Sequence, residues 1–383
     1  METKLSDVVA LTRDMVRTPS LSGEEGNVAA LVAERMRALG FSVSVDRNGS
    51  VIGTMGPEST DIALLFDGHL DVVPVSGSWT HEPFGGEIVD GKLYGRGSTD
   101  MKGGIAAAIC GVADAAVSGQ LKRRVAVSAS VLEEVIEGHA IASVLDICQP
   151  GAVVICEPSK LHVKTGQKGR MEILLTLHGK PAHAASPECG VNPLHAAARA
   201  LIALEAIELP TSQELGDALL VPTDIVSSPY PSISMIPIAT TIRFDRRVLP
   251  GETQEQVIAE IEHCLRDAGV QDFNVAVTGD QVTTYTGEKS SPSRFLPAWQ
   301  LDDAHPLKQH ALSAVKAAGL EPQIGTWRFC TNGSESAGRR RIPTIGLGPG
   351  NEEDAHTIDE SVELSQLESA REIYKQLVLL MAA

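Results

Sequence analysis

A short apolar run at residues 62–66 ends at Gly68 and is followed at once by His69 and Asp71. A run of this length that stops at a glycine is typical of a buried central strand that reaches the edge of its sheet. His69 and Asp71 are two residues apart, so at the strand period both side chains leave the chain on the same face. Open α/β proteins place their ligand sites just past the carboxyl ends of such strands. The chain is therefore expected to form an α/β sheet with a ligand or metal site at this edge.

Further acidic and histidine residues lie where other apolar runs end. Asp100 follows a glycine-rich turn and precedes an alanine-rich helical run from Ile105 to Val117. The others are Glu133, Glu134, Glu157 and His356. Taken alone, a His-x-Asp pair beside a strand is more often a structural hydrogen bond, and adjacent glutamates are more often solvated charges on a helix. The position of the glutamates after an apolar strand favours a site instead, because parallel strands bring their carboxyl ends to one edge.

Charge and cysteine content limit the classes of function. The chain has 383 residues, with 32 basic and 49 acidic side chains and a formal net charge of −17. This charge argues against nucleic-acid binding, which needs a basic footprint, and an anionic substrate would need a local group of arginines. The six cysteines include no C-x-x-C pair, which indicates free thiols in a reducing compartment. No apolar signal core or membrane-length run is evident, so we expect a cytoplasmic protein that binds no membrane.

The order of the expected elements predicts two domains. Strands and helices alternate over residues 1–165 and again over 282–383, which predicts a discontinuous α/β catalytic domain with a mostly parallel central sheet flanked by helices. Over residues 166–281 the pattern changes to long alternating strands, one of them at Ser232–Arg246, and two helices. This segment is expected to form an inserted α+β lid and dimerisation domain.

A helix start is predicted near the beginning of the chain. Ser22 is followed three residues later by Glu25, the spacing of a capping box in which each side chain accepts a backbone N–H of the other residue. Gly40 directly follows Leu39 and would stop the helix. We therefore expect a helix over Glu24–Leu39 that Ser22 and Glu25 cap.

Five fragments of the chain, taken in order, resemble one known family. They are His69-Leu70-Asp71, the run GRGSTDMKGG at residues 95–104, Glu133-Glu134, Glu157-Pro158 and His356. Together they are similar to the M20 family of dinuclear metallohydrolases, which includes the aminoacylases, carboxypeptidase G2-like enzymes, acetylornithine deacetylase and succinyl-diaminopimelate desuccinylase. The resemblance runs from TPSLSGEE to the C-terminal helix and covers nearly the whole chain. The run DRRVLPGE at residues 245–252, with Thr-Asn-Gly and Gly-Pro-Gly, looks closer to the YgeY-like branch.

The resemblance implies a pair of bound metal ions. Five residues would hold two divalent ions. His69 and Glu157 would bind the first ion, Glu134 and His356 would bind the second, and Asp100 would bridge both. Asp71 would accept the second ring N–H of His69 and fix its tautomer. The family often has a cis peptide bond after the bridging aspartate, here between Asp100 and Met101.

The acidic residues support metal binding independently of the resemblance. With Asp71 and Glu133 included, five carboxylates in one cleft would repel each other and take up protons unless cations neutralised them. Imidazole together with carboxylate suits Zn²⁺, and also Co²⁺ or Mn²⁺. A bridging carboxylate fits a pair of ions about 3.5–4 Å apart.

Further residues are candidates for catalysis and substrate binding. The resemblance makes Glu133 the general base, which takes a proton from a metal-activated water and delivers it to the leaving amine. It also makes His183 the group that stabilises the tetrahedral oxyanion, often across a dimer; the alternative is a loop histidine that caps the following turn. Arg246 is our candidate for binding a substrate carboxylate, with strand-edge charge as the alternative. Asn332 and Gly333 precede an expected helix start and could present backbone N–H groups to the substrate.

The expected function is metal-dependent hydrolysis of an amide bond in a small N-acyl amino acid or short peptide, by a homodimer formed through the lid. The alternatives are hydrolysis of N-carbamoyl amino acids on the same scaffold, and a metal-free binding protein. Many relatives carry an asparagine just before the Ile-Pro of a lid strand, where this chain has Ser234-Met235-Ile236-Pro237. This departure weakens the case for a desuccinylase and leaves the acyl group open.

Overall fold

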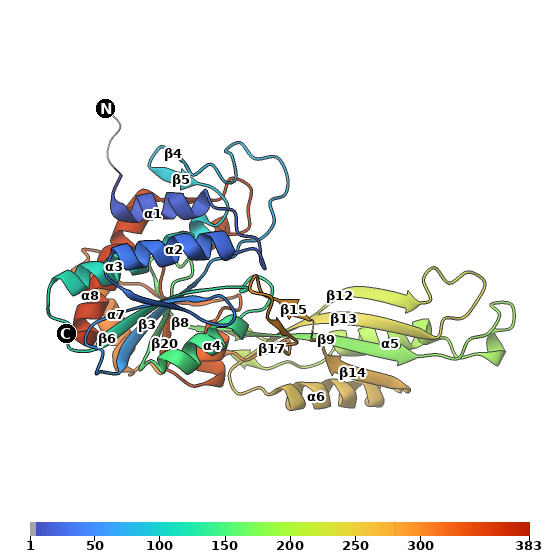
Figure 1. The fold of residues 1–383 in the computed structure, drawn as a ribbon. Coiled ribbons are helices and arrows are strands. Elements are labelled where there is room, and N and C mark those ends of the chain that lie inside the picture. Colours follow the sequence, from blue (N-terminus) through green and yellow to red (C-terminus); the bar gives the residue numbers. More distant parts are fainter. Residues whose placement is uncertain (1–4, 280) are drawn as a thin grey trace. The chain divides into compact units, whose positions relative to one another are not determined.

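The computed structural model describes residues 5–279 and 281–383, which divide into two compact units (Figure 1). The first unit takes in the chain up to Gln167, Gln281–Ser290 and Gln300–Ala383, and the second takes in residues 168–279 and Ser291–Trp299. The short second excursion, Ser291–Trp299, is not part of the predicted division. Within the described ranges, no helix combines the length and the apolar character needed to cross a membrane.

The first unit is built on a mixed sheet whose central strands are parallel. Its strands lie in the order β1 (Ser42–Val45), β2 (Val51–Met55), β6 (Arg124–Ser130), β3 (Ile62–His69), β7 (Val153–Ile155), β20 (Thr344–Gly346) and β8 (Val163–Gln167), and β19 (Ile324–Trp327) also pairs with β8. β3 runs parallel to both β6 and β7, and it is buried along its whole length, as a strand covered on both faces must be. The pairs β1–β2, β2–β6 and β20–β8 are antiparallel. The α/β class is therefore confirmed, with a sheet that is mixed at its edges.

Helices pack on both faces of this sheet. They are α2 (Gly26–Ala38), α3 (Gly103–Val117), α4 (His139–Cys148), α7 (Pro306–Ala317) and α8 (Leu364–Ala382), and α1 (Asp7–Val16) packs on α3 and α8. On one face of β3, the Phe66 ring lies 4.9 Å from the Tyr374 ring of α8. A Cβ on Gly68 would lie 2.6 Å from the Ile105 side chain of α3, so only glycine allows this approach. α4 packs against β3 and β6.

Shorter elements complete the first unit. A small antiparallel sheet joins β21 (Ser361–Glu363), β5 (Lys92–Tyr94) and β4 (Glu87–Val89). β15 (Val282–Thr283) pairs with β16 (Lys289–Ser290), and β18 (Trp299–Gln300) is the last strand of the main sheet, next to β8. Three helical turns are η1 (Ser98–Lys102), η3 (Ser334–Arg339) and η4 (Glu352–Asp354).

The predicted capping box at the start of α2 is wrong. The helix begins at Gly26, and no side chain caps its first turn. Instead, Ser22 Oγ donates to Asp71 Oδ2 at 2.7 Å, and Glu25 Oε1 accepts N–H bonds from Gly23 and Leu132 at 3.0 and 3.1 Å. Both side chains thus hold segments at the ends of β3 and β6, which a spacing rule for local contacts does not take into account.

The second unit is an antiparallel sheet with two helices packed against it. Its strands lie in the order β12 (Leu219–Ser228), β13 (Ala239–Val248), β9 (Gly169–His178) and β14 (Phe273–Val277), and β17 (Phe295–Leu296) also pairs with β9. The helices are α5 (Pro193–Glu205) and α6 (Gln254–Asp267), with a turn η2 (Pro187–Cys189) and a hairpin of β10 (Thr211–Ser212) and β11 (Gly216–Asp217). Along β9 and β13 every second residue is buried, and those residues form the core beneath α5 and α6.

Candidate metal centre

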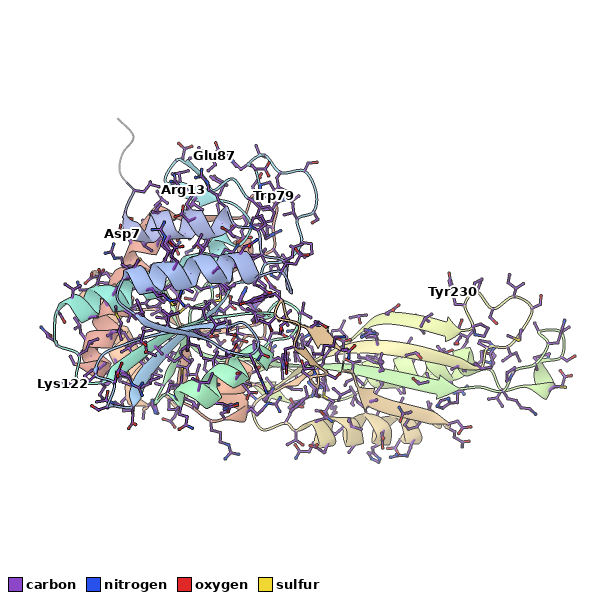
Figure 2. The ribbon with its side chains drawn as sticks, viewed as in Figure 1. Asp7, Arg13, Trp79, Glu87, Lys122 and Tyr230 are labelled. Carbon is purple, nitrogen blue, oxygen red and sulfur yellow. The ribbon has the colours of Figure 1, made fainter. Side chains whose placement is uncertain are left out.

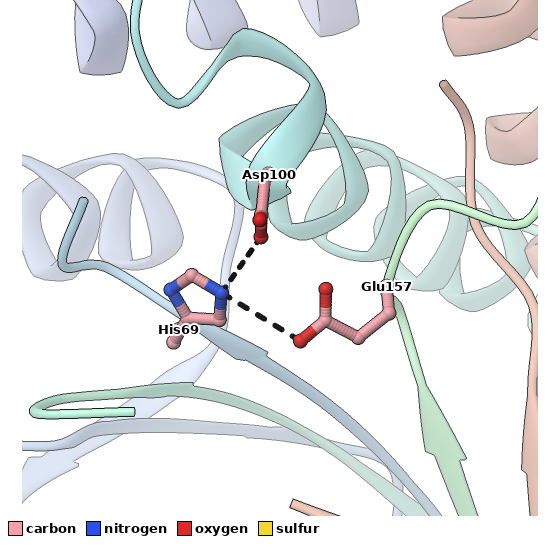
Figure 3. A group of neighbouring side chains, drawn as sticks. All are labelled: His69, Asp100 and Glu157. Carbon is pink, nitrogen blue, oxygen red and sulfur yellow. Dashed lines mark hydrogen bonds and ion pairs between the residues drawn. The ribbon is translucent and has the colours of Figure 1, made fainter. Parts of the chain in front are cut away.

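The proposed metal ligands and Glu133 lie around the carboxyl end of β3 in the first unit. His69 is the last residue of β3, and its Nε2 lies 3.0 Å from Asp100 Oδ1 (Figure 3). The same nitrogen lies 3.6 Å from Glu157 Oε1, just after β7. Ligand atoms of these three residues all lie within 4.8 Å of one another. They form the first cluster, which consists of His69, Asp100 and Glu157.

A second cluster uses the other oxygen of Asp100. His356 Nε2 lies 3.1 Å from Asp100 Oδ2 and 3.1 Å from Glu134 Oε1. Ligand atoms of Asp100, Glu134 and His356 also lie within 4.8 Å of one another, and these residues form the second cluster. Asp100 therefore faces one histidine with each oxygen, which is the arrangement that a bridging carboxylate needs. The cis peptide bond between Asp100 and Met101 is also present, as the resemblance predicts.

Burial and mutual repulsion change the pKa values across both clusters. Burial raises the pKa of Glu134 to about 7, and the charge of Asp100 adds to this effect. Burial also raises the pKa of Glu157 well above its usual range, with Asp100 again contributing. Burial would raise the pKa of Asp100 too, but hydrogen bonds from His356 and His69 outweigh it and hold that pKa well below its usual range. Hydrogen bonds to Asp100 and Glu134 raise the pKa of His356 to about 10. The clusters therefore hold protons that a bound cation would displace.

Glu133 lies beside the first cluster without belonging to it. Its Oε2 is 3.9 Å from His69 Nε2, and burial raises the pKa of its carboxyl well above the usual range. The main-chain N–H groups of Glu133 and Glu134 donate to the two oxygens of Asp71 at 3.0 and 3.1 Å. One carboxylate thus fixes the backbone of two consecutive glutamates. Glu133 thus has a fixed backbone, and its buried carboxyl belongs to neither cluster.

Asp71 holds His69 in a different way from the one predicted. The Nδ1 atom of His69 bonds the main-chain oxygen of Asp71 at 2.8 Å, while Asp71 Oδ1 is 3.7 Å away. The carboxylate is instead taken up by Ser22 and the two N–H groups after β6. Because a carbonyl oxygen can only accept, Nδ1 carries the hydrogen and Nε2 remains available as a ligand atom.

The second unit contains His183 and Arg246, each of which has partners within that unit. The exposed His183 accepts the Ala185 N–H on Nδ1 at 3.0 Å. Arg246 lies on the buried face of β13, with a side chain 1% exposed, and pairs with Glu252 at the start of α6. A guanidinium that is already paired and buried does not favour the predicted contact with a substrate carboxylate.

Asn332 and Gly333 bond within the first unit. Asn332 Nδ2 donates to Asp67 Oδ2 at 2.8 Å, and its Oδ1 accepts the Gly138 N–H at 2.7 Å. The Gly333 N–H donates to Thr331 Oγ1 at 3.0 Å. This network ties β3 to the start of α4, and it does not favour the predicted contact of these groups with substrate.

The two clusters fit metal ions. Each offers one imidazole nitrogen and two carboxylates, a donor set suited to Zn²⁺ and its neighbours in the first transition row. Over residues 5–279 and 281–383, no lysine or arginine forms an ion pair with the carboxylates of Asp100, Glu133, Glu134 or Glu157. Several buried carboxylates that share two histidines and pair with no lysine or arginine among the described residues indicate that cations neutralise them.

Sequence reasoning missed two buried charges near the site. Glu360 is 1% exposed and bonds the turn that carries Asp100. Lys102 is fully buried, and its Nζ donates to the carbonyl oxygens of Met15 and Thr18 at 3.0 and 3.1 Å. Burial lowers the pKa of Lys102 to about 7. The position of Glu360, four residues after His356, was the one available signal.

Comparison with known proteins identifies the family of the chain. A family model described as peptidase family M20/M25/M40 matches residues 65–380. The YgeY protein of Escherichia coli K12 is 29% identical over 387 residues, which cover 98% of this chain and 94% of that protein. Succinyl-diaminopimelate desuccinylase of Cereibacter sphaeroides is 29% identical over 395 residues, 97% of this chain and 98% of that one. The crystal structure of YxeP from Bacillus subtilis, described as a dinuclear metal-binding peptidase, has a TM-score of 0.74 at 14% identity and covers 98% of this chain and 97% of its own.

Proposed function

This chain belongs to peptidase family M20/M25/M40 and is a metal-dependent hydrolase of amide bonds in small acyl amino acids or peptides, and we propose that Glu133 is its general base. One observation carries the proposal. Asp100 lies between two histidines, one per cluster, while Glu133 lies beside the first cluster and outside both. The site thus separates residues that hold cations from a residue that can move a proton.

The proposed cofactor is a pair of divalent ions, one per cluster, with Zn²⁺ preferred and Co²⁺ or Mn²⁺ as alternatives. The mixed imidazole and carboxylate donors of the clusters support this choice, as does the description of YxeP as a dinuclear metal-binding peptidase. Such ions lower the pKa of a water molecule and polarise the carbonyl group of the substrate. The residues of the chain must supply the remaining chemistry.

Glu133 would take the proton of the attacking water and hand it to the amine that leaves. Its buried carboxyl lies 3.9 Å from His69 Nε2, beside the first cluster, and this position supports the proposed cycle. Asp71 supports the same step by fixing the N–H groups of Glu133 and Glu134, so that the base keeps its position relative to the second cluster.

His183 is proposed to stabilise the tetrahedral oxyanion. Its Nδ1 accepts the Ala185 N–H, so in the neutral ring Nε2 carries the hydrogen and is the nitrogen that can donate. This hydrogen bond is the one expected of a loop histidine that caps a turn, which is the alternative role. It also leaves the Nε2–H group free to donate to the oxyanion.

Replacing His183 with alanine is expected to lower kcat by about 10²- to 10³-fold, the usual loss when one oxyanion donor is removed. Metal content should stay at the wild-type value, because His183 belongs to neither cluster. His195→Ala, an exposed histidine of α5, is the matched control and should leave kcat unchanged. Steady-state kinetics with metal analysis decides the matter, and a His183→Ala kcat within threefold of wild type would make this histidine structural.

A substrate screen tests the proposed function. Metal-reconstituted protein is assayed with acetyl, succinyl, formyl and carbamoyl amino acids beside dipeptides, and the Glu133→Gln variant serves as the blank. Release of free amino acid by wild type but not by the variant supports the proposal. Activity confined to the carbamoyl substrates would favour the alternative hydrolase, and no turnover in any arm would favour a binding protein.

A homodimer formed through the second unit is proposed from the edge strand β12. Among the residues that the structure describes, β12 pairs only with β13, and four of its apolar side chains are 44–49% exposed: Leu219, Val221, Ile225 and Val226. Tyr230, in the loop after this strand, is 80% exposed (Figure 2). A long apolar edge strand is unusual in a protein that stays monomeric.

A cytoplasmic location remains a prediction from the cysteine pattern.

Sedimentation equilibrium is expected to give twice the chain mass of 40.5 kDa. A charge on the open edge should break the pairing, so Ile225→Lys should return the mass of one chain. Ile147→Lys, at an exposed isoleucine of α4, is the control and should remain dimeric. A single-chain mass for the wild-type protein would contradict the dimer.

A further inference from the structure

We propose that Glu360 is a positioning residue of the metal centre, because its buried carboxylate holds the turn that carries Asp100. The inference rests on the proposed metal-dependent function and adds to it a residue that touches neither ion nor substrate. Asp100 must direct one oxygen to each cluster, and an aspartate side chain has few torsions of its own. Its direction therefore depends on how rigidly its backbone is held.

The two carboxylate oxygens of Glu360 accept hydrogen bonds from four donors. Oε1 accepts the N–H groups of Thr99 and Asp100 at 2.9 and 3.0 Å. Oε2 accepts the Gly97 N–H at 3.1 Å and Arg96 Nη1 at 2.6 Å. A carboxylate has about four acceptor sites, so the group is saturated. Three backbone N–H groups of the turn that carries Asp100 are thus bound by one side chain that is 1% exposed.

The same contacts join two of the three segments that supply the second cluster, those of Asp100 and His356. Glu360 lies four residues after His356, and the Gly95 N–H donates back to the Glu360 carbonyl at 2.8 Å. Thr99 Oγ1 donates to the Ser361 carbonyl at 2.6 Å, which adds a second link between these segments. Asp100 and His356 are far apart in sequence. The link through Glu360 fixes the turn that carries Asp100 against β21, the strand that follows His356.

Negative charge at position 360 is needed for this arrangement. A glutamine has one acceptor oxygen, and its amide would turn N–H groups toward the Gly97 N–H and the Arg96 guanidinium. Arg96 cannot turn away easily, since its guanidinium also lies over the Trp79 ring at 5.1 Å from the ring centre. Glu360→Gln should therefore loosen the turn at Asp100 while side-chain volume is kept.

Metal binding gives the test, independently of turnover. Metal-stripped wild type, Glu360→Gln and the control Glu363→Gln are titrated with Mn²⁺ and followed by calorimetry. Glu363 is the exposed last residue of β21, three positions after Glu360, and the Glu363→Gln protein should bind like wild type. In Glu360→Gln we expect affinity for the weaker of the two ions to fall by about 10- to 100-fold, as for other residues that orient a ligand. Wild-type affinity for both ions in a folded Glu360→Gln protein would overturn the proposal.

A second variant covers the case in which Glu360→Gln does not fold. Thr99→Val removes only the Thr99–Ser361 hydrogen bond and keeps the side-chain shape, and we expect an affinity loss of about fivefold. If Glu360→Gln is unfolded and Thr99→Val binds both ions as tightly as wild type, the proposal fails. If Glu360→Gln binds metal more weakly but the wild-type protein turns over no substrate, the positioning role is upheld and the proposed function is rejected. If both variants bind metal normally and the wild-type protein is active, the proposed function is upheld and the positioning role is rejected.

Discussion

Glu133→Gln is expected to lower kcat by about 10²- to 10⁴-fold, the contribution of a positioned general base, while both metal ions stay bound. The reason is the position of Glu133 beside the first cluster and outside both sets of ligands. Glutamine keeps the size of the side chain, and the main-chain N–H that bonds Asp71 is unchanged. Only the ability to take up and release a proton is lost.

The neighbouring glutamate provides a matched comparison. Glu134→Gln removes a carboxylate from the second cluster, so this variant should lose metal as well as activity. Steady-state kinetics and elemental analysis of both proteins separate the two roles. If Glu133→Gln lost an ion, or kept more than a tenth of the wild-type kcat, Glu133 would not be the base.

Removal of the metal ions is expected to abolish turnover, and their return as Zn²⁺, Co²⁺ or Mn²⁺ should restore it. The ions should also stabilise the fold, because they bind carboxylates that the folded chain holds close together. At a free concentration 100 times Kd, each ion adds about 2.7 kcal/mol to the free energy of unfolding. Turnover that resists a strong chelator, in protein that elemental analysis finds free of metal, would refute a metal-dependent mechanism.

The size of this stabilisation should depend on pH. Glu134 has a pKa of about 7 in the fold against an ordinary 4.5, so the unfolded chain loses this proton first as pH rises. The metal-stripped protein should therefore lose stability between pH 4.5 and 7. His356, with a pKa of about 10 against 6.5, acts in the same direction at higher pH. Bound ions offset this loss, so they should raise Tm more at pH 8 than at pH 5.5.

Proton release provides a second measurement of the same effect. An ion that binds the second cluster at neutral pH must displace protons from Glu134 and His356. Titration calorimetry in buffers of different ionisation enthalpy should detect these protons, and Glu134→Gln should release fewer. An equal Tm gain at both pH values, together with no proton release, would contradict the assigned ligands.

The sequence places the proposed ligands most directly where they follow strands. His69 ends β3 and Glu157 follows β7, so the parallel arrangement of those strands brings both residues to one edge without further information. Asp100 needs the resemblance as well, because the glycine-rich turn before it does not fix where its carboxylate points. The α/β class follows from the same alternation of strands and helices.

Residues that act through tertiary contacts were beyond this reasoning. Ser22 and Glu25 have the spacing of a capping box, yet each bonds a segment far along the chain, since burial at the ends of β3 and β6 outweighs the local preference. Arg246 shares a face of β13 with Ile242, Phe244 and Val248, so the alternation indicates a buried position, which the assignment to a substrate carboxylate did not take into account. No strand was predicted over Leu219–Ser228, because its apolar residues are exposed and follow no single face.

The central claim is that Asp100 bridges two metal ions, and Mn²⁺ loading tests it most directly. Metal-stripped protein is titrated with Mn²⁺, the bound metal is counted, and the electron paramagnetic resonance spectrum is recorded. Two ions about 3.5–4 Å apart with a shared carboxylate should give two Mn²⁺ per chain and a spin-coupled spectrum. One Mn²⁺ per chain, or two with the spectrum of isolated ions, would contradict the account.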